Sequence, residues 1–79
     1  MNIKFQVSIY PLETKQVDSC VLRAIDSLKD SGVEYVTNDM STVITADSSK
    51  GFEVTQKLFE KAASEGKVVM NVTVSNACG

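Results

Sequence analysis

The sequence predicts a ferredoxin-like α+β domain, in which a four-stranded antiparallel sheet carries two helices on one face. Two observations favour this class. The 79 residues suffice for one domain, which we expect to span residues 1–79. Apolar periodicities follow the order strand, helix, strand, strand, helix, strand. Right-handed crossovers then place the first and third strands at the centre, the fourth beside the first and the second at the far edge.

Two clear apolar patterns define the first strand and the first helix. Along residues 3–10 every second side chain is apolar, and Pro11 ends the segment. From residue 14 to residue 31 apolar side chains recur at helical spacing, and Gly32 suits a left-handed helix stop. The expected helical stripe is Val17, Cys20, Val21, Ala24, Ile25 and Leu28. Cys20 is therefore interpreted as a small core residue.

The second half of the chain predicts a hairpin, a helix and a last strand. Residues 33–37 and 41–46 are β-prone segments separated by turn residues. The DSS sequence that follows can cap a helix, which Gly66 closes. The expected apolar stripe of this helix is Phe52, Thr55, Phe59, Ala62 and Ala63, with Leu58 beside it. Residues 68–75 alternate again and form the fourth strand, with Val68, Met70, Val72 and Val74 on its core face.

The face of the sheet that the helices leave uncovered is polar but carries little charge. The expected polar cluster consists of Gln6, Ser8 and Tyr10 on the first strand and Asn71, Thr73 and Ser75 on the fourth. Lys4 and Glu34 are the only charged residues in the assigned strands. These side chains could be solubilising residues. As a cluster, they favour a surface desolvated by a partner chain, by a neutral heteroaromatic ligand, or by both.

Composition argues against several classes of protein. The net charge of −2 gives no electrostatic footprint for nucleic acid or anionic membranes, and an RNA-binding sheet would need stacked aromatics and basic surroundings. Cys20 and Cys78 lie far apart and the chain has no histidine, which argues against a metal site, a cofactor or a disulfide framework. No apolar run approaches the roughly 20 residues that span a bilayer. We expect a cytoplasmic protein with reduced thiols.

Three functional classes stay open on this evidence. A binding protein for a small molecule is favoured by the uncharged polar cluster. A structural or regulatory oligomerisation module is the alternative, with the same face as a protein contact only. An enzyme on this fold, such as an acylphosphatase-like hydrolase or a dimeric small-barrel oxygenase, is least favoured, because the only arginine is Arg23 in mid-helix and histidine is absent.

Several segments resemble the thiamin/hydroxymethylpyrimidine-binding (YkoF-like) family. They are the closing VVMNVTVSNAC, the hairpin NDMSTVI, the helix FEVTQKLFEKAASEG and the strand end Tyr10-Pro11-Leu12, which together span essentially the whole chain. The resemblance implies a ferredoxin-like domain that binds thiamin or its hydroxymethylpyrimidine part without catalysis, linked to uptake or salvage of the vitamin. Some members join two such domains, whereas this chain holds one, which favours a homodimer or a higher even-numbered oligomer built around the uncovered face.

Such a ligand fits the chemistry of the candidate residues. An aminopyrimidine needs amides, hydroxyls or carboxylates at fixed angles and a flat apolar wall. The hydrogen-bonding candidates are Gln6, Ser8, Thr42, Asn71, Thr73 and Ser75. Tyr10 and Met40 are the candidates for the wall, and the Asp39 carboxylate is the candidate partner of a cationic thiazolium. Turn aspartates more often cap their own backbone, and the terminal Cys78-Gly79 departs from the Pro-Gly turn with which the family often continues.

Overall fold

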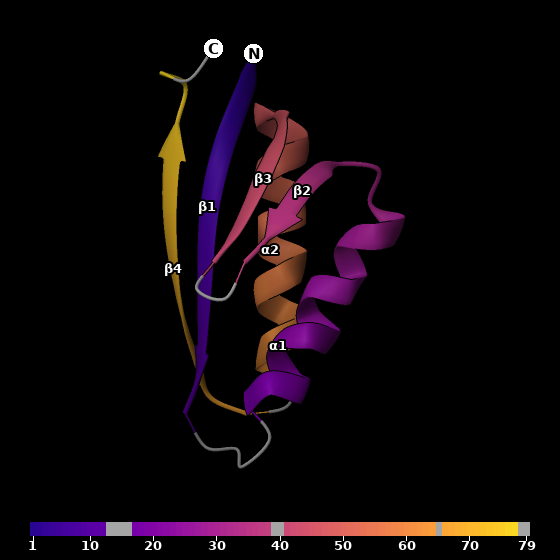
Figure 1. Cartoon of the computed structure of the whole chain (residues 1–79), viewed down its shortest axis with the longest axis vertical. Helices are drawn as coiled ribbons and strands as arrows, with labels where there is room; N and C mark the ends of the chain where they lie inside the picture. Colours follow the sequence, from indigo (N-terminus) through magenta and orange to yellow (C-terminus); the bar gives the residue numbers. More distant parts are fainter. Residues whose placement is uncertain (13–16, 39–40, 65, 78–79) are drawn as a thin grey trace.

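The computed structural model describes residues 1–12, 17–38, 41–64 and 66–77, and its elements follow the predicted order (Figure 1). The elements are β1 (Asn2–Pro11), α1 (Val17–Asp26), the 3₁₀ helix η1 (Ser27–Asp30), β2 (Glu34–Thr37), β3 (Thr42–Asp47), α2 (Ser48–Ala63) and β4 (Val68–Ser75). The strands pair in the order β2-β3-β1-β4, and every pair is antiparallel. The predicted ferredoxin-like fold and strand order are confirmed.

The core lies between the sheet and the two helices. Figure 1 shows α1 and α2 on one side of the sheet, with β4 and β2 at its two edges. The largest fully buried side chains are Phe5, Leu28, Ile44 and Leu58, which come from β1, η1, β3 and α2. Cys20 is buried in this layer and its thiol donates to the Ala62 carbonyl oxygen over 3.8 Å, so its predicted place in the core is confirmed.

Three predicted features of the helix ends agree with the structure. The Asp47 carboxylate accepts a hydrogen bond from the Ser49 backbone N–H at 3.3 Å, which confirms the predicted cap of α2. Gly32 has φ of 81°, as the predicted left-handed stop requires. Gly66 follows α2 with φ of 139°. The expected α-helix to residue 31 is wrong at its end, because residues 27–30 tighten into η1; residues 14–16 lie outside the described part.

The predicted apolar stripe of α2 is confirmed for Thr55, Leu58 and Ala62 and is wrong for Phe52 and Phe59. Phe52 and Phe59 are 55% and 40% exposed, whereas Gly51, Val54, Thr55, Leu58 and Ala62 are buried. The cause is the close approach of α2 to β1 at Gly51, where the Phe5 ring occupies the space that a Cβ would need. Phe52 therefore lies beside the core, with its ring edge-on to that of Phe5 at a centroid distance of 5.0 Å.

The expected core face of β4 is covered only in part. Val72 pairs with Val7, and Val74 pairs with Phe5, so both valines lie on the helix side of the sheet. They are nevertheless 37% and 41% exposed, whereas their partners on β1 are buried. The helix layer therefore stops short of the β4 edge. No helix in the described part of the chain combines the length and apolar character needed to cross a membrane.

Candidate functional site

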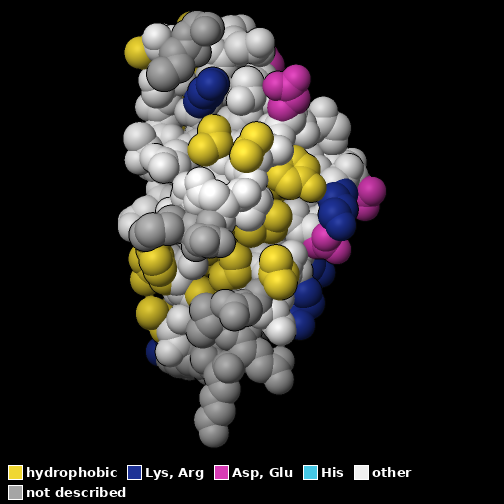
Figure 2. All heavy atoms as spheres, viewed as in Figure 1, with side chains coloured by type: hydrophobic (Ala, Val, Ile, Leu, Met, Phe, Trp, Pro, Cys, Tyr) yellow, Lys and Arg dark blue, Asp and Glu magenta, His cyan; other side chains and the backbone are white. Residues whose placement is uncertain are grey.

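The first candidate site is the uncovered face, which we define as the sheet side opposite the helices. The register of β1 and β4 joins the predicted cluster in cross-strand pairs, with Gln6 opposite Thr73, Ser8 opposite Asn71, Tyr10 opposite Val69 and Lys4 opposite Ser75. Directly opposed side chains lie about 4.5–5.5 Å apart at Cβ, so the six predicted residues form one continuous patch. Figure 2 shows a largely uncharged middle of the visible face, with charged side chains mainly toward the α1 side and the upper end.

Two of these polar side chains already take part in local hydrogen bonds. The Gln6 amide nitrogen donates to the Ser41 hydroxyl at 3.4 Å, and the Ser75 hydroxyl accepts from the Ala77 backbone N–H at 3.0 Å. Asn71 and Thr73 are exposed in mid-strand, where a rigid backbone holds them. The patch offers amide and hydroxyl groups on a sheet surface, and it becomes an enclosed site only when something covers it.

Three predicted ligand residues do not join this patch. Thr42 pairs with Val7 on the helix side of the sheet and is buried, with its hydroxyl 3.1 Å from that of Thr37. Thr42 therefore lies apart from the polar cluster, and its hydroxyl pairs with a neighbouring hydroxyl inside the hairpin. Its role as a ligand residue stays a prediction. Asp39 and Met40, the proposed thiazolium partner and apolar wall, lie outside the described residues, as does Cys78.

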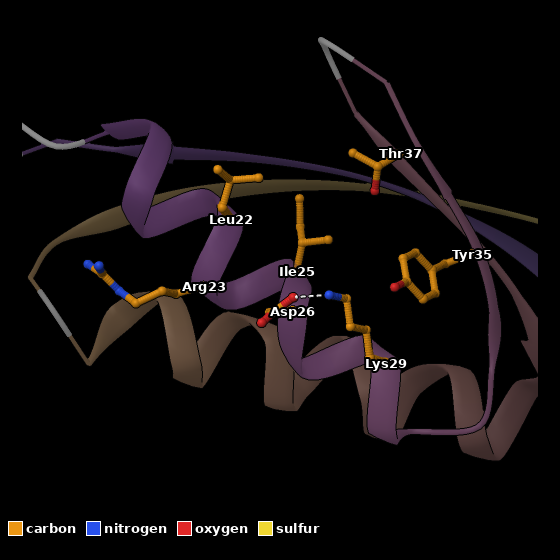
Figure 3. Close-up of a pocket in the computed structure, with 7 residues that line it drawn as sticks. All are labelled: Leu22, Arg23, Ile25, Asp26, Lys29, Tyr35 and Thr37. Carbon is orange, nitrogen blue, oxygen red and sulfur yellow. Dashed lines mark ion pairs between the residues drawn. The ribbon is translucent and has the colours of Figure 1, made fainter.

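The second candidate site is a concave groove between α1, η1 and β2, with a volume of about 470 Å³ (Figure 3). The groove is shallow and largely open to solvent, so this volume is not that of an enclosed pocket. The groove forms because α1 packs mainly on β1 and α2, and so leaves space beside β2 at the sheet edge. Its lining consists of Leu22, Arg23, Ile25, Asp26, Lys29, Tyr35 and Thr37.

The groove combines an aromatic wall with a charged rim. The half-buried Tyr35 stands on β2 with its hydroxyl directed toward α1, and Leu22 and Ile25 supply aliphatic surface on the α1 side (Figure 3). On the rim, the Lys29 ammonium lies 2.8 Å from the Asp26 carboxylate. The hydrogen bond to Asp26 and its negative charge raise the pKa of Lys29 above its ordinary value. Both partners are exposed, so water screens this pair.

The sequence interpretation missed the groove. Leu22 lies off the apolar stripe of its helix and is exposed, and an apolar residue at such a position is one signal of a binding surface. Tyr35 is a typical strand residue and gives no such signal. The distance between α1 and β2 depends on how the helices pack together, which periodicity does not reveal. Within the described residues, no group of three or more His, Cys, Asp or Glu could hold a metal ion.

Comparison with known proteins gives one family and several similar structures. A model of the YKOF-related family matches residues 2–79. A protein of Thermotoga maritima, described provisionally as a thiamine biosynthesis/salvage protein, has a TM-score of 0.86 and 14% identity, covering 100% of this chain and 87% of its own.

Two further structures have the same architecture. A Streptococcus pneumoniae protein has a TM-score of 0.89 and 19% identity, covering 95% of this chain and 86% of its own. A DUF77 domain of unknown function from Bacillus cereus has a TM-score of 0.83 and 22% identity, covering 95% of this chain and 75% of its own. At these identities the likeness shows the fold alone. A search of curated proteins gave no match.

Proposed function

Because the chain belongs to the YKOF-related family, we propose that it binds thiamin or the hydroxymethylpyrimidine part of thiamin without catalysis. The provisional description of the similar Thermotoga maritima protein supports this ligand class. The proposal extends to a place in uptake or salvage of the vitamin, because a protein that binds the compound unchanged serves its transfer or retention.

The observation that carries the proposal is the α1–β2 groove. It is an open depression against which one heterocyclic ring can lie, and its Tyr35 ring offers the flat wall that an aminopyrimidine or a thiazolium can stack upon. Arg23 extends away from Tyr35 and Thr37, so its charge does not occupy the space between α1 and β2 (Figure 3). We therefore place the ligand between Ile25 and Tyr35.

The charges on the groove distinguish the two ligands. Thiamin carries a cationic thiazolium, whereas hydroxymethylpyrimidine is neutral at pH 7. The Asp26 carboxylate lines the groove and can attract the cation, although Lys29 now neutralises it in part. An exposed ion pair contributes about 0.2–1 kcal/mol, so Asp26 should add at most a few-fold to the affinity for thiamin.

The uncovered face is the alternative location for the ligand. Its continuous patch of amides and hydroxyls, including Asn71 and Thr73, matches the hydrogen-bonding needs of an aminopyrimidine. This patch requires a cover, so the alternative also requires a second copy of the chain on that face. The same contact without a ligand is the structural or regulatory role, which the uncharged side chains of the cluster favour.

Calorimetric titration with thiamin and with hydroxymethylpyrimidine tests the function and the site. We expect saturable binding, which Tyr35→Ala should weaken about fivefold or more for both ligands, while Tyr35→Phe retains most of the affinity. Asp26→Asn should weaken the affinity for thiamin by about twofold to fivefold and leave the affinity for hydroxymethylpyrimidine unchanged.

Two control variants complete the experiment. Asp30→Asn removes a nearby carboxylate that does not line the groove and should change neither affinity. Asn71→Ala should also leave binding unchanged if the ligand occupies the groove. A loss of several-fold in Asn71→Ala with an unchanged Tyr35→Ala would move the ligand to the uncovered face. No saturable binding of either compound to the folded protein would contradict the function itself.

A further inference from the structure

Two threonine hydroxyls connect the α1–β2 groove with the buried side of the hairpin. Thr37 on β2 lines the groove, and its direct cross-strand partner on β3 is Thr42. The two hydroxyl oxygens lie 3.1 Å apart, so one hydroxyl donates to the other. Thr37 is exposed, whereas Thr42 is buried at 3% exposure. One member of the pair therefore faces the space where we place the ligand, and the other lies in the core.

The burial of Thr42 decides which hydroxyl donates. Within the described part of the chain, the Thr42 hydroxyl has the Thr37 hydroxyl as its one hydrogen-bond partner. If Thr37 donated, the hydroxyl hydrogen of Thr42 would be buried without an acceptor, and an unpaired buried donor is costly. If Thr42 donates, the exposed Thr37 keeps its own hydrogen for water or for a ligand. The second arrangement is therefore the more stable one.

Thr37 lies beside the aromatic wall of the groove. Thr37 and Tyr35 are two residues apart on β2, so they share one face of the strand and lie about 7 Å apart at Cα. Figure 3 shows the Thr37 oxygen on the side that faces Ile25 and Tyr35. A heterocycle that stacks on the Tyr35 ring therefore has one edge within reach of the Thr37 hydroxyl. That edge must present a hydrogen-bond acceptor.

We propose that Thr37 donates a hydrogen bond to a ring nitrogen of the bound pyrimidine, and that Thr42 holds the Thr37 hydroxyl in its donating orientation. This contact presupposes the proposed function and the groove as its site. An aminopyrimidine has two ring nitrogens that accept hydrogen bonds and one exocyclic amine that donates them. Thr37 thus selects the edge of the ring by direct contact, and Thr42 is a positioning residue that acts through Thr37.

The same contact orients thiamin in the groove. In Figure 3 the Asp26 carboxylate and the Lys29 ammonium lie on the opposite side of Ile25 from Thr37. With a pyrimidine nitrogen at Thr37, the neutral ring occupies the end of the groove formed by Leu22 and Thr37. The cationic thiazolium then lies toward the Asp26 carboxylate, whose charge is opposite to its own.

A ligand analogue separates this contact from a structural effect. The analogue is the aminobenzyl alcohol in which both ring nitrogens of hydroxymethylpyrimidine are replaced by C–H and the amine is kept. In calorimetric titrations, Thr37→Val should lower the preference for hydroxymethylpyrimidine over this analogue by about fivefold, because valine keeps the shape and removes the donor. Thr37→Ser should retain the preference. Thr45→Val, on the opposite face of the hairpin, is the matched control and should also retain it.

The positioning role of Thr42 has its own test. Thr42→Val keeps the shape of the buried side chain but leaves the Thr37 hydroxyl free to rotate. The preference for hydroxymethylpyrimidine over the aminobenzyl alcohol should therefore fall by about twofold, and Thr42→Ser should restore it. Circular dichroism verifies that each variant is folded. An unchanged preference in Thr42→Val would overturn the role of Thr42.

A second analogue tests the polarity of the Thr37 contact, since it lacks the exocyclic amine and keeps both ring nitrogens. Thr37→Val should leave the preference for hydroxymethylpyrimidine over this compound unchanged. A loss of that preference would show that Thr37 accepts from the amine, and would overturn the assignment. An equal loss of affinity for all three compounds, or no loss for any, would also overturn it and leave the proposed function in place. No binding of hydroxymethylpyrimidine to the wild type would overturn both.

Discussion

Gly51→Ala should destabilise the protein, although the same substitution in most helices is stabilising. In an unhindered helix interior, alanine stabilises the helix by about 1 kcal/mol more than glycine does. Here an added Cβ would lie 2.1 Å from one ring carbon of Phe5 and 2.5 Å from the next, whereas ordinary contact begins near 3.4 Å. The ring or the helix must therefore move by more than about 1 Å in a close-packed core.

The size of the effect follows from opposing contributions. Phe5 is fully buried and is held by Phe52 on the same side of the sheet, so displacement of its ring should cost near the upper end of the overpacking range, about 3 kcal/mol. The propensity gain offsets about 1 kcal/mol of this cost. We expect a net loss of about 2 kcal/mol, equivalent to a fall in Tm of roughly 8–16 °C in a domain of this size.

Urea unfolding followed by circular dichroism measures the loss, and a double-mutant cycle assigns it to the ring. In the Phe5→Leu background the smaller side chain leaves room for the Cβ, so Gly51→Ala should there be nearly neutral or stabilising. Ser49→Ala, on the exposed surface of the same helix, serves as the control and should change stability by less than about 0.5 kcal/mol. Equal or higher stability of Gly51→Ala in the wild-type background would refute the reasoning.

Three further predictions concern stability. The amino terminus of Met1, 3.0 Å away, and the Ser49 N–H hold the pKa of Asp47 below its usual range, so the stability that this carboxylate contributes should be present at neutral pH and be lost as pH falls through its folded-state pKa. Urea unfolding across pH 2–7 should show that Asp47→Ala lowers the unfolding free energy at neutral pH and changes it little in strong acid. Thr55→Val should raise the unfolding free energy by about 1 kcal/mol, because the buried Thr55 hydroxyl has no hydrogen-bond partner among the described residues, and a lower value in chemical denaturation would contradict this. Cys20→Ala should lower Tm through a small cavity and leave ligand affinity unchanged; a variant with full stability but no binding would give the thiol a role in the site.

The strand order and the polar cluster could be predicted because both depend on period-two patterns. A right-handed crossover places β4 beside β1, and alternation then puts Asn71 and Ser8 on one face. The side of the sheet on which Thr42 lies could not be predicted, because a threonine next to a turn gives little sign of it, and only the register with Val7 assigns Thr42 to the core.

The orientation of α2 and the groove could not be obtained in this way. The aromatic residues Phe52 and Phe59 dominate the apolar pattern of α2, yet the helix turns its smallest residue, Gly51, toward β1 because the Phe5 ring needs that space. The groove likewise results from the offset between α1 and β2. Both features depend on the fit of side chains between elements, which hydrophobic periodicity does not record.

A titration of ¹⁵N-labelled protein with thiamin, followed by NMR, tests the central proposal most directly because it reports binding and location together. The proposal predicts saturable shifts centred on the amides of Ile25, Lys29, Tyr35 and Thr37, which line the groove on both sides. Hydroxymethylpyrimidine should shift the same amides. Shifts confined to β1 and β4 around Ser8 and Asn71 would contradict the groove, and the absence of saturable shifts with both compounds at millimolar concentration would contradict thiamin-related binding by this chain.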